Sequence, residues 1–225
     1  MDESIFNALL LADSRLPTGS YAYSAGLEPA VMAGLRVDAV PAYMQARLQT
    51  VTRLECGGAV QAHRLASARS APEAYVLLDA AISARTPSQA LRAASRSLGR
   101  ALLRLALSLR PDDPGVRALG GLEQAPARGI VLGVFGAALA VDERRCAEIC
   151  CYDDLQCVAE ATLKLLPTTP ATVTQWVVAA GDQVGAIVEQ ACSLRSAKEL
   201  PALSAPWMEQ WAQAHAQQAR RLFLA

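Results

Sequence analysis

Two pairs of adjacent aspartates, Asp112–Asp113 and Asp153–Asp154, are candidates for metal chemistry in this sequence. Carboxylate oxygens are the ligands that Mg²⁺ prefers, and an all-helical synthase of the prenyl type would add a third carboxylate at helical spacing. Neither pair continues in that way, because the first runs into Pro114 and the second into Leu155. We therefore expect no magnesium chemistry at either pair.

Six cysteines could serve as metal ligands or as redox groups. Three of them, Cys146, Cys150 and Cys157, would share one face of a helix. A thiolate metal site usually includes a Cys-x-x-Cys pair or nearby histidines, and the sequence has neither around these residues. Free cysteines are frequently buried, so we interpret the cysteines as helical thiols and predict no bound metal and no cofactor. The six are Cys56, Cys146, Cys150, Cys151, Cys157 and Cys192.

General acid–base or nucleophilic catalysis has little support in the sequence. The two histidines, His63 and His215, are far apart, and no partner for a general base can be identified. The phosphate-binding loop, the nucleophile elbow and the His-Glu-x-x-His zinc motif are all missing. We predict a protein that is not an enzyme. An all-α small-molecule enzyme remains open, and it would show a deep cavity lined by polar groups with shifted pKa values.

An arginine-rich segment is the strongest charge feature. Residues 85–110 contain six arginines and no acid, and four of these arginines recur at every fourth position. One interpretation is a solvated helix face, or a face paired with the acid-rich segment 142–160. The other is a docking face for an acidic protein, to which the planar guanidinium group is suited. The four spaced arginines are Arg92, Arg96, Arg100 and Arg104.

A polar, turn-forming segment interrupts the apolar pattern between residues 12 and 34. Pro17 and two glycines shape the backbone around Tyr21, Tyr23 and Ser24. Ordered surface loops often carry function, and paired tyrosines are favoured at protein interfaces. The alternative is that the two tyrosines cover the helical core while their hydroxyl groups reach water.

The elements that position these residues are all predicted to be helices. Apolar residues recur at helical spacing, whereas the alternation typical of strands is never sustained. Two capping boxes, at Ser70 and Thr86, and prolines in first turns mark helix starts. We predict a single all-α domain over residues 1–225, with about eight to ten helices; strand is the competing prediction for the valine-rich stretch 173–188. The expected helices span residues 4–13, 27–35, 39–67, 73–84, 88–109, 114–123, 127–140, 143–165, 170–194 and 206–222.

Composition narrows the class of protein. The chain has 21 basic and 21 acidic residues among 225, which argues against a protein built to bind nucleic acid. Its longest uncharged apolar stretch, 129–141, is shorter than the roughly 20 residues that a membrane span needs. No cationic region precedes the first apolar stretch, so we expect no secretory signal, reduced thiols and a cytoplasmic location.

Three blocks of the sequence resemble the urease accessory protein F family. Residues 16–28, Leu-Pro-Thr-Gly-Ser-Tyr-Ala-Tyr-Ser-Ala-Gly-Leu-Glu, are similar to the N-terminal signature of that family. Residues 84–100 are similar to its Arg- and Gly-containing middle helix, and residues 133–138 to its Gly- and Ala-rich buried helix. The order and spacing of the three blocks fit across nearly the whole chain.

The resemblance implies a nickel-insertion co-chaperone rather than a catalyst. A member of this family would form a homodimer, bind the accessory protein D or H, recruit the accessory GTPase G and deliver nickel to apo-urease. The implied partner-binding residues in the signature are Tyr21, Tyr23, Ser24 and Glu28. Arg96 and Arg100 are candidates for the face toward the GTPase.

The C-terminal residues carry a further expectation. Residues 220–225 combine two arginines with apolar side chains at the end of the sequence, a composition suited to a flexible tail that orders on a partner. Arg220 and Arg221 match basic residues of the family's tail, and we expect them to contact a partner. An all-α adaptor unrelated to urease is the remaining alternative.

Overall fold

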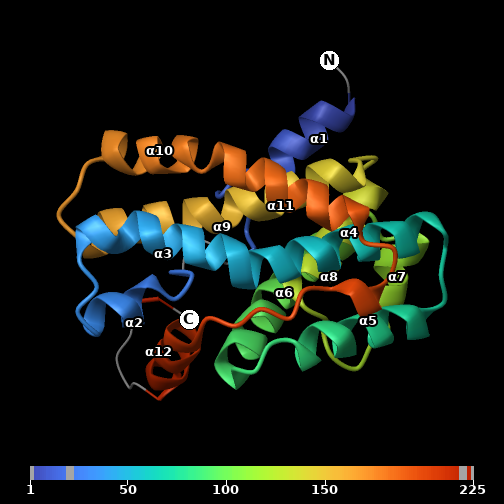
Figure 1. Ribbon diagram of the computed structural model, residues 1–225. Helices are drawn as coiled ribbons and strands as arrows, with labels where there is room; N and C mark the ends of the chain where they lie inside the picture. The colour runs from blue at the N-terminus through green and yellow to red at the C-terminus, as the bar shows by residue number, and fades with distance from the viewer. Residues whose placement is uncertain (1–2, 19–22, 218–221, 224–225) are drawn as a thin grey trace.

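In the computed structural model, residues 3–18, 23–217 and 222–223 are described, and all regular secondary structure among them is helical (Figure 1). The prediction of an all-α fold is therefore confirmed. The α-helices are α1 (Glu3–Leu11), α2 (Leu27–Met32), α3 (Val40–Arg47), α4 (Arg53–Ser67), α5 (Pro72–Ala84), α6 (Gln89–Leu109), α7 (Pro114–Gly120), α8 (Arg128–Ala138), α9 (Glu143–Leu165), α10 (Pro170–Ala179), α11 (Gly181–Ser193) and α12 (Pro206–Ala216). Short turns η2 (Val37–Ala39) and η4 (Ala197–Glu199) have 3₁₀ geometry.

Helix α8 lies at the centre of the fold. It packs against α4, α6, α7 and α9, and its residues from Gly129 to Gly136 are all buried. Close packing depends on glycine, because a Cβ atom on Gly133 would overlap the backbone carbonyl of Ala59 in α4. The interpretation of residues 133–138 as part of a buried helix agrees with this position. The rest of the core is supplied by alanine and leucine faces of the surrounding helices.

Helices α3 and α4 form one long rod, interrupted by a wider turn. The prediction was a single helix over 39–67, but residues Leu48–Thr52, labelled η3, have π-helical geometry. A π segment inserts an extra residue into the helix without breaking the rod, so the apolar period alone did not reveal it. In Figure 1 the rod crosses the body of the molecule above α6 and α12.

The expected helix over 170–194 is in fact two helices. Helix α10 ends at Ala179 and α11 begins at Gly181, with Ala180 between them. Glycine has low helix propensity, and Gly181 stands at the junction. The competing strand prediction for 173–188 was wrong, because this whole stretch is helical apart from Ala180.

Helix starts follow proline more closely than the capping-box pattern. Helices α5, α7, α10 and α12 each begin at a proline, as the sequence indicated. The two predicted capping boxes are not formed: the residue before α5 is Ala71, which has no capping side chain, and α6 is capped by Ser88 rather than Thr86. The Oγ atom of Ser88 accepts a hydrogen bond from the backbone N–H of Leu91 at 3.3 Å.

Candidate functional site

The carboxylate of Glu28, in the first turn of α2, is a meeting point of distant segments. It accepts hydrogen bonds from Nε2 of His215 in α12 at 2.9 Å, and from the backbone N–H groups of Leu222 at 2.8 Å and Phe223 at 3.1 Å. Glu28 is only 4% exposed. A carboxylate that accepts several hydrogen bonds in a buried position fixes its neighbours firmly. Glu28 therefore connects the N-terminal signature to the C-terminal residues that the structure describes.

Two further residues of the signature, Ser24 and Tyr23, also make contacts within the protein. Ser24 is fully buried, and its Oγ atom accepts a hydrogen bond from the backbone N–H of Glu28 at 3.4 Å. The hydroxyl oxygen of Tyr23 accepts a hydrogen bond from Nη2 of Arg47 at 3.2 Å. Loss of contact with water raises the pKa of Tyr23, so its hydroxyl group stays protonated. Tyr21 lies outside the described residues.

The backbone of the signature turns sharply before α2. Ala25 and Gly26 both have positive φ, at 52° and 77°, a region that favours glycine. The hydroxyl group of Tyr43 in α3 donates a hydrogen bond to the carbonyl oxygen of Ala25 at 2.6 Å. This contact fixes the turn against the long rod, which explains why the sequence needs both a glycine and a tyrosine here.

Arg47 anchors this region through a buried ion pair that the sequence analysis did not predict. Its Nε and Nη2 atoms lie 2.7–2.9 Å from the carboxylate of Asp154 in α9. Thr52 donates a further hydrogen bond to Asp154 at 2.7 Å. The sequence did contain one indication that Arg47 is buried and paired, because Arg47 falls on the apolar face of its helix, between Met44 and Leu48.

Asp153–Asp154, considered first as a magnesium pair, binds two arginines instead. Asp154 pairs with Arg47, and Oδ2 of Asp153 lies 2.6 Å from Nη2 of Arg128. Each of the two buried carboxylates therefore has an arginine as its ion-pair partner.

The four spaced arginines of α6 have different environments. Nη2 of Arg96 pairs with Asp79 at 2.5 Å, and Nη1 of Arg92 binds backbone carbonyls. Arg100 and Arg104 are exposed, and neither has a hydrogen-bond or ion-pair partner among the described residues. The acid-rich segment 142–160 makes its described ion pairs with other arginines, so the suggested pairing between it and the α6 arginines was wrong.

A groove of about 400 Å³ brings several predicted residues together. It lies between α2, α6 and α12, and its lining includes Tyr23, Arg100, Arg104 and His215. Figure 1 shows α12 beside α2 in the lower part of the molecule. Arg96 lines a different cavity, so the structure separates it from Arg100. Arg220 and Arg221 lie outside the described residues, directly before Leu222 and Phe223, which Glu28 binds.

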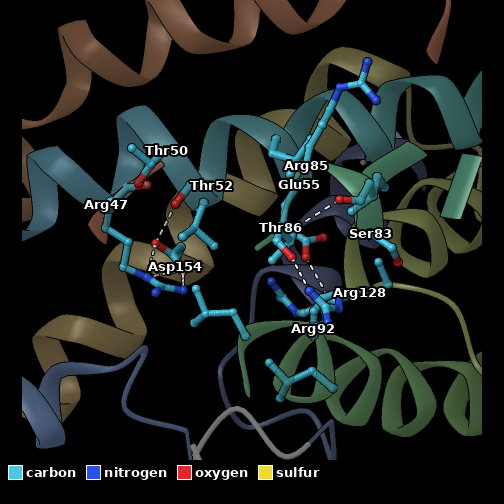
Figure 2. Close-up of a pocket in the computed structure, with 18 of the residues that line it drawn as sticks. Arg47, Thr50, Thr52, Glu55, Ser83, Arg85, Thr86, Arg92, Arg128 and Asp154 are labelled. Carbon is cyan, nitrogen blue, oxygen red and sulfur yellow. Dashed lines mark hydrogen bonds and ion pairs between the residues drawn. The ribbon is translucent and has the colours of Figure 1, made fainter. Parts of the chain in front are cut away.

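A second, smaller cavity of about 70 Å³ lies between the long rod, α5, α6 and the start of α8 (Figure 2). Glu55 accepts hydrogen bonds there from Oγ of Ser95 at 2.5 Å and from the backbone N–H of Gly129 at 2.6 Å. Loss of contact with water raises the pKa of Glu55. A polar cavity with a shifted pKa is the feature that the enzyme alternative required. Its carboxylates, however, are already bound by the protein's own donors.

The cysteines are free thiols. Sγ of Cys56 lies 3.3 Å from Sγ of Cys151 between α4 and α9, and burial raises the pKa of the Cys146 and Cys157 thiols. Among residues 3–18, 23–217 and 222–223, no three histidine, cysteine or acidic side chains form a metal-binding group. Within the same described ranges, no helix has both the length and the apolar character needed to cross a lipid bilayer.

These observations define an all-helical protein in which two sequence-distant motifs meet at one buried carboxylate. The sequence model of the UreF family matches residues 36–181. The chain is 36% identical to the urease accessory protein UreF of Mycolicibacterium vanbaalenii over 222 residues, which cover 98% of both chains. It is 36% identical to the UreF of Mycobacterium bovis and 35% identical to that of Mycobacterium tuberculosis, each over 219 residues, 96% of this chain and 97% of the relative.

The chain therefore belongs to the UreF family of urease accessory proteins. Membership of this family supports a role in urease maturation. The resemblance that the three sequence blocks suggested is confirmed, over nearly the whole chain.

Proposed function

We propose that the protein is a co-chaperone for the incorporation of nickel into apo-urease. In this role it binds the accessory protein D or H, recruits the accessory GTPase G and regulates it, without catalysing a reaction itself. The observation that carries the proposal is the similarity to urease accessory proteins over 96–98% of the chain. A regulator acts on a GTPase by binding one of its nucleotide-dependent conformations more tightly than the other.

The partner surface in this proposal surrounds the groove between α2, α6 and α12. Arg100 supplies an exposed guanidinium group beside it, and the Glu28 contacts hold the C-terminal segment nearby. Tyr21, Arg220 and Arg221 lie outside the described residues, and the proposal includes them as partner-contacting residues on the family resemblance alone. Tyr23, Ser24 and Glu28 then act from inside, by holding the shape of the surface. Arg96 supports α6 through Asp79.

A homodimer in the cytoplasm is the second part of the proposal. It is supported by the family resemblance and by an exposed apolar face on α1. The side chains of Ile5, Phe6 and Leu9 are 41–64% exposed there, and contiguous apolar surface is typical of protein interfaces.

The test is co-purification of the full chain with the D/H protein and the GTPase G at physiological salt. We expect Arg100→Ala, and separately the double variant Arg220→Ala and Arg221→Ala, to weaken the complex about tenfold or more, as expected for arginines central to an interface. The matched control is Arg117→Ala. This arginine is exposed, and its helix, α7, lies away from α12 in Figure 1.

Two results would contradict parts of the proposal. If the wild-type protein did not co-purify with the D/H protein, the co-chaperone role would be wrong. If it did, and all the arginine variants bound as well as Arg117→Ala, the function would stand and the assignment of the surface would be wrong.

A further inference from the structure

The cavity in Figure 2 contains a buried guanidinium group that is only partly used. The Arg47 side chain is 3% exposed, and its Nε and Nη2 atoms bind Asp154. Its Nη1 atom is buried and has no hydrogen-bond partner among the described residues. Leaving a buried donor unpaired is unfavourable, and more so when the group is charged. Arg47 is one of the residues that line the cavity, and an acceptor bound there within reach of Nη1 would satisfy this donor.

Two other arginines of the cavity also have donors to spare. Arg92 uses Nη1 for the carbonyl oxygens of Thr86 and Pro87, at 2.5 and 2.8 Å. Arg128 uses Nη2 for Asp153. The remaining guanidinium nitrogens of both arginines have no hydrogen-bond partner in the part of the chain that the structure describes. Figure 2 shows both side chains reaching into the same side of the cavity.

The carboxylates that line the cavity, in contrast, already accept hydrogen bonds from the protein. Asp154 accepts them from Arg47 and Thr52, and Glu55 from Ser95 and Gly129. Glu209, at the edge toward α12, accepts one from the backbone N–H of Ala205 at 3.3 Å. The cavity therefore has an excess of N–H donors over free acceptors.

The size of the cavity limits its ligand. A buried water needs about 10–15 Å³ of such space, so about 70 Å³ corresponds to roughly five waters or one small ion with its hydration. A nucleotide is far too large. The planar, multidentate guanidinium group is suited to carboxylate and phosphate oxygens.

We propose that this cavity binds a small oxyanion, of the carboxylate or phosphate type, between Arg47, Arg92 and Arg128. The anion accepts hydrogen bonds from Nη1 of Arg47 and from the free nitrogens of the other two arginines. The proposal does not depend on the proposed role in urease maturation, since it concerns the isolated chain.

The test measures the thermal unfolding of the full chain in sodium acetate, in sodium phosphate and in sodium chloride at equal ionic strength. We expect a saturable rise in Tm with acetate or phosphate and none with chloride, and the two oxyanion series show which type the cavity prefers. Arg92→Gln should raise the apparent Kd for the oxyanion at least tenfold. The control, Arg104→Gln, changes an exposed arginine of the same helix and should leave the Kd unchanged.

Several outcomes would overturn the proposal. The first is a Tm that rises no more with acetate or phosphate than with chloride. The second is an equal loss of oxyanion affinity in Arg92→Gln and Arg104→Gln, and the third is an unchanged affinity in Arg92→Gln. A crystal structure of the wild-type chain soaked in selenate provides a second test that needs no variant. Anomalous density for selenium between Arg47 and Arg92 supports the site, and ordered water alone at that position rejects it.

Discussion

Nε2 of His215 lies 2.9 Å from Oε2 of Glu28, although 187 positions separate the two residues in the sequence. The same carboxylate receives the backbone N–H groups of Leu222 and Phe223. One side chain of α2 thus holds both the last helix and the segment that follows it. Phe223 is buried, and Nζ of Lys164 lies 5.2 Å from the centre of its ring.

Replacing Glu28 with glutamine should loosen the C-terminal segment. The variant keeps the shape of the side chain but removes its charge and one acceptor oxygen, and hydrogen bonds to charged groups contribute about 1.5–3 kcal/mol each. We expect the free energy of unfolding to fall by about 2 kcal/mol, and amide exchange at Leu222 and Phe223 to accelerate. Mass-spectrometric hydrogen exchange measures the second effect. Glu123→Gln, at an exposed position, is the control, and equal exchange in both variants would disprove the role of Glu28.

Removing the Arg47 guanidinium group should be among the more damaging single changes. Arg47→Met leaves the Asp154 carboxylate buried without its main partner, which typically costs about 3–5 kcal/mol. Urea unfolding measures the loss. Adding Asp154→Leu should restore part of it, because the unpaired charge is then gone. If the double variant were less stable than Arg47→Met by the full cost of a second independent change, the two residues would not be coupled.

Replacing each of two glycines with alanine should change the stability of the protein in opposite directions. A Cβ atom on Gly133 would overlap the backbone of α4, so Gly133→Ala forces α4 and α8 apart and should cost about 2 kcal/mol or more. Gly185 lies within α11 with open space around its Cα atom, so Gly185→Ala should add about 0.4–1 kcal/mol of stability. Thermal unfolding of the two variants measures both changes in stability. A stable Gly133→Ala protein would show that the two helices are not in close contact.

The ion pair between Arg64 and Glu143 predicts a pH dependence. Hydrogen bonds from Nε and Nη2 of Arg64, both at 2.7 Å, lower the pKa of Glu143 below its usual 4.5. The folded protein therefore binds the proton of the Glu143 carboxyl group less tightly than the unfolded chain does. The stability that the ion pair contributes is present above pH 4.5, and it is lost as the pH falls through the pKa of Glu143 in the folded protein. In urea unfolding at several pH values, the stability difference between wild type and Glu143→Gln should be largest near neutral pH and shrink in acid. A difference that did not change with pH would show that the Arg64–Glu143 pair contributes no pH-dependent stability.

Two arginines one turn apart on α6 should differ in their effect on stability. Arg96→Ala removes the partners of Asp79 and Gln124 and should cost about 1–3 kcal/mol. Arg100→Ala removes an exposed group and should stay within about 0.5 kcal/mol of wild type. Urea unfolding distinguishes the two. A loss of partner binding in Arg100→Ala would then be a direct effect on the interface, whereas the same loss in Arg96→Ala would need comparison with its stability.

Most of the fold could be predicted because helix starts and faces are local features. Prolines in first turns and apolar residues at helical spacing located most of the helices. From α5 to α9 the predicted ends lie within three residues of the observed ones, and both ends of α9 are exact. The break at Ala180 was missed because the valine spacing continues across it. The π turn was missed because it takes up its extra residue within one turn, so the apolar residues before and after it both still face the core.

The site was less predictable, because its partners are distant in sequence. The family signature drew attention to Glu28, but its partners His215, Leu222 and Phe223 can be recognised only from the fold. Asp154 was examined as a magnesium ligand, whereas its partner Arg47 lies 107 positions away. The sequence feature that indicated a buried ion pair was Arg47 itself, a charged residue on the apolar face of its helix.

The π turn at Leu48–Thr52 has a consequence for how the sequence can vary. Each residue of a regular α-helix advances the side-chain direction by about 100°. The π turn accommodates one extra residue within a single turn, so deleting one residue from it should restore ordinary helix and leave the faces on both sides nearly in register. Glu55 would then still point toward α8, where it accepts the backbone N–H of Gly129, while Arg47 kept its place. A deletion in the regular turns of α4 would instead rotate every side chain beyond it by about 100°. The rod should therefore tolerate the loss of one residue at this turn better than anywhere else along its length.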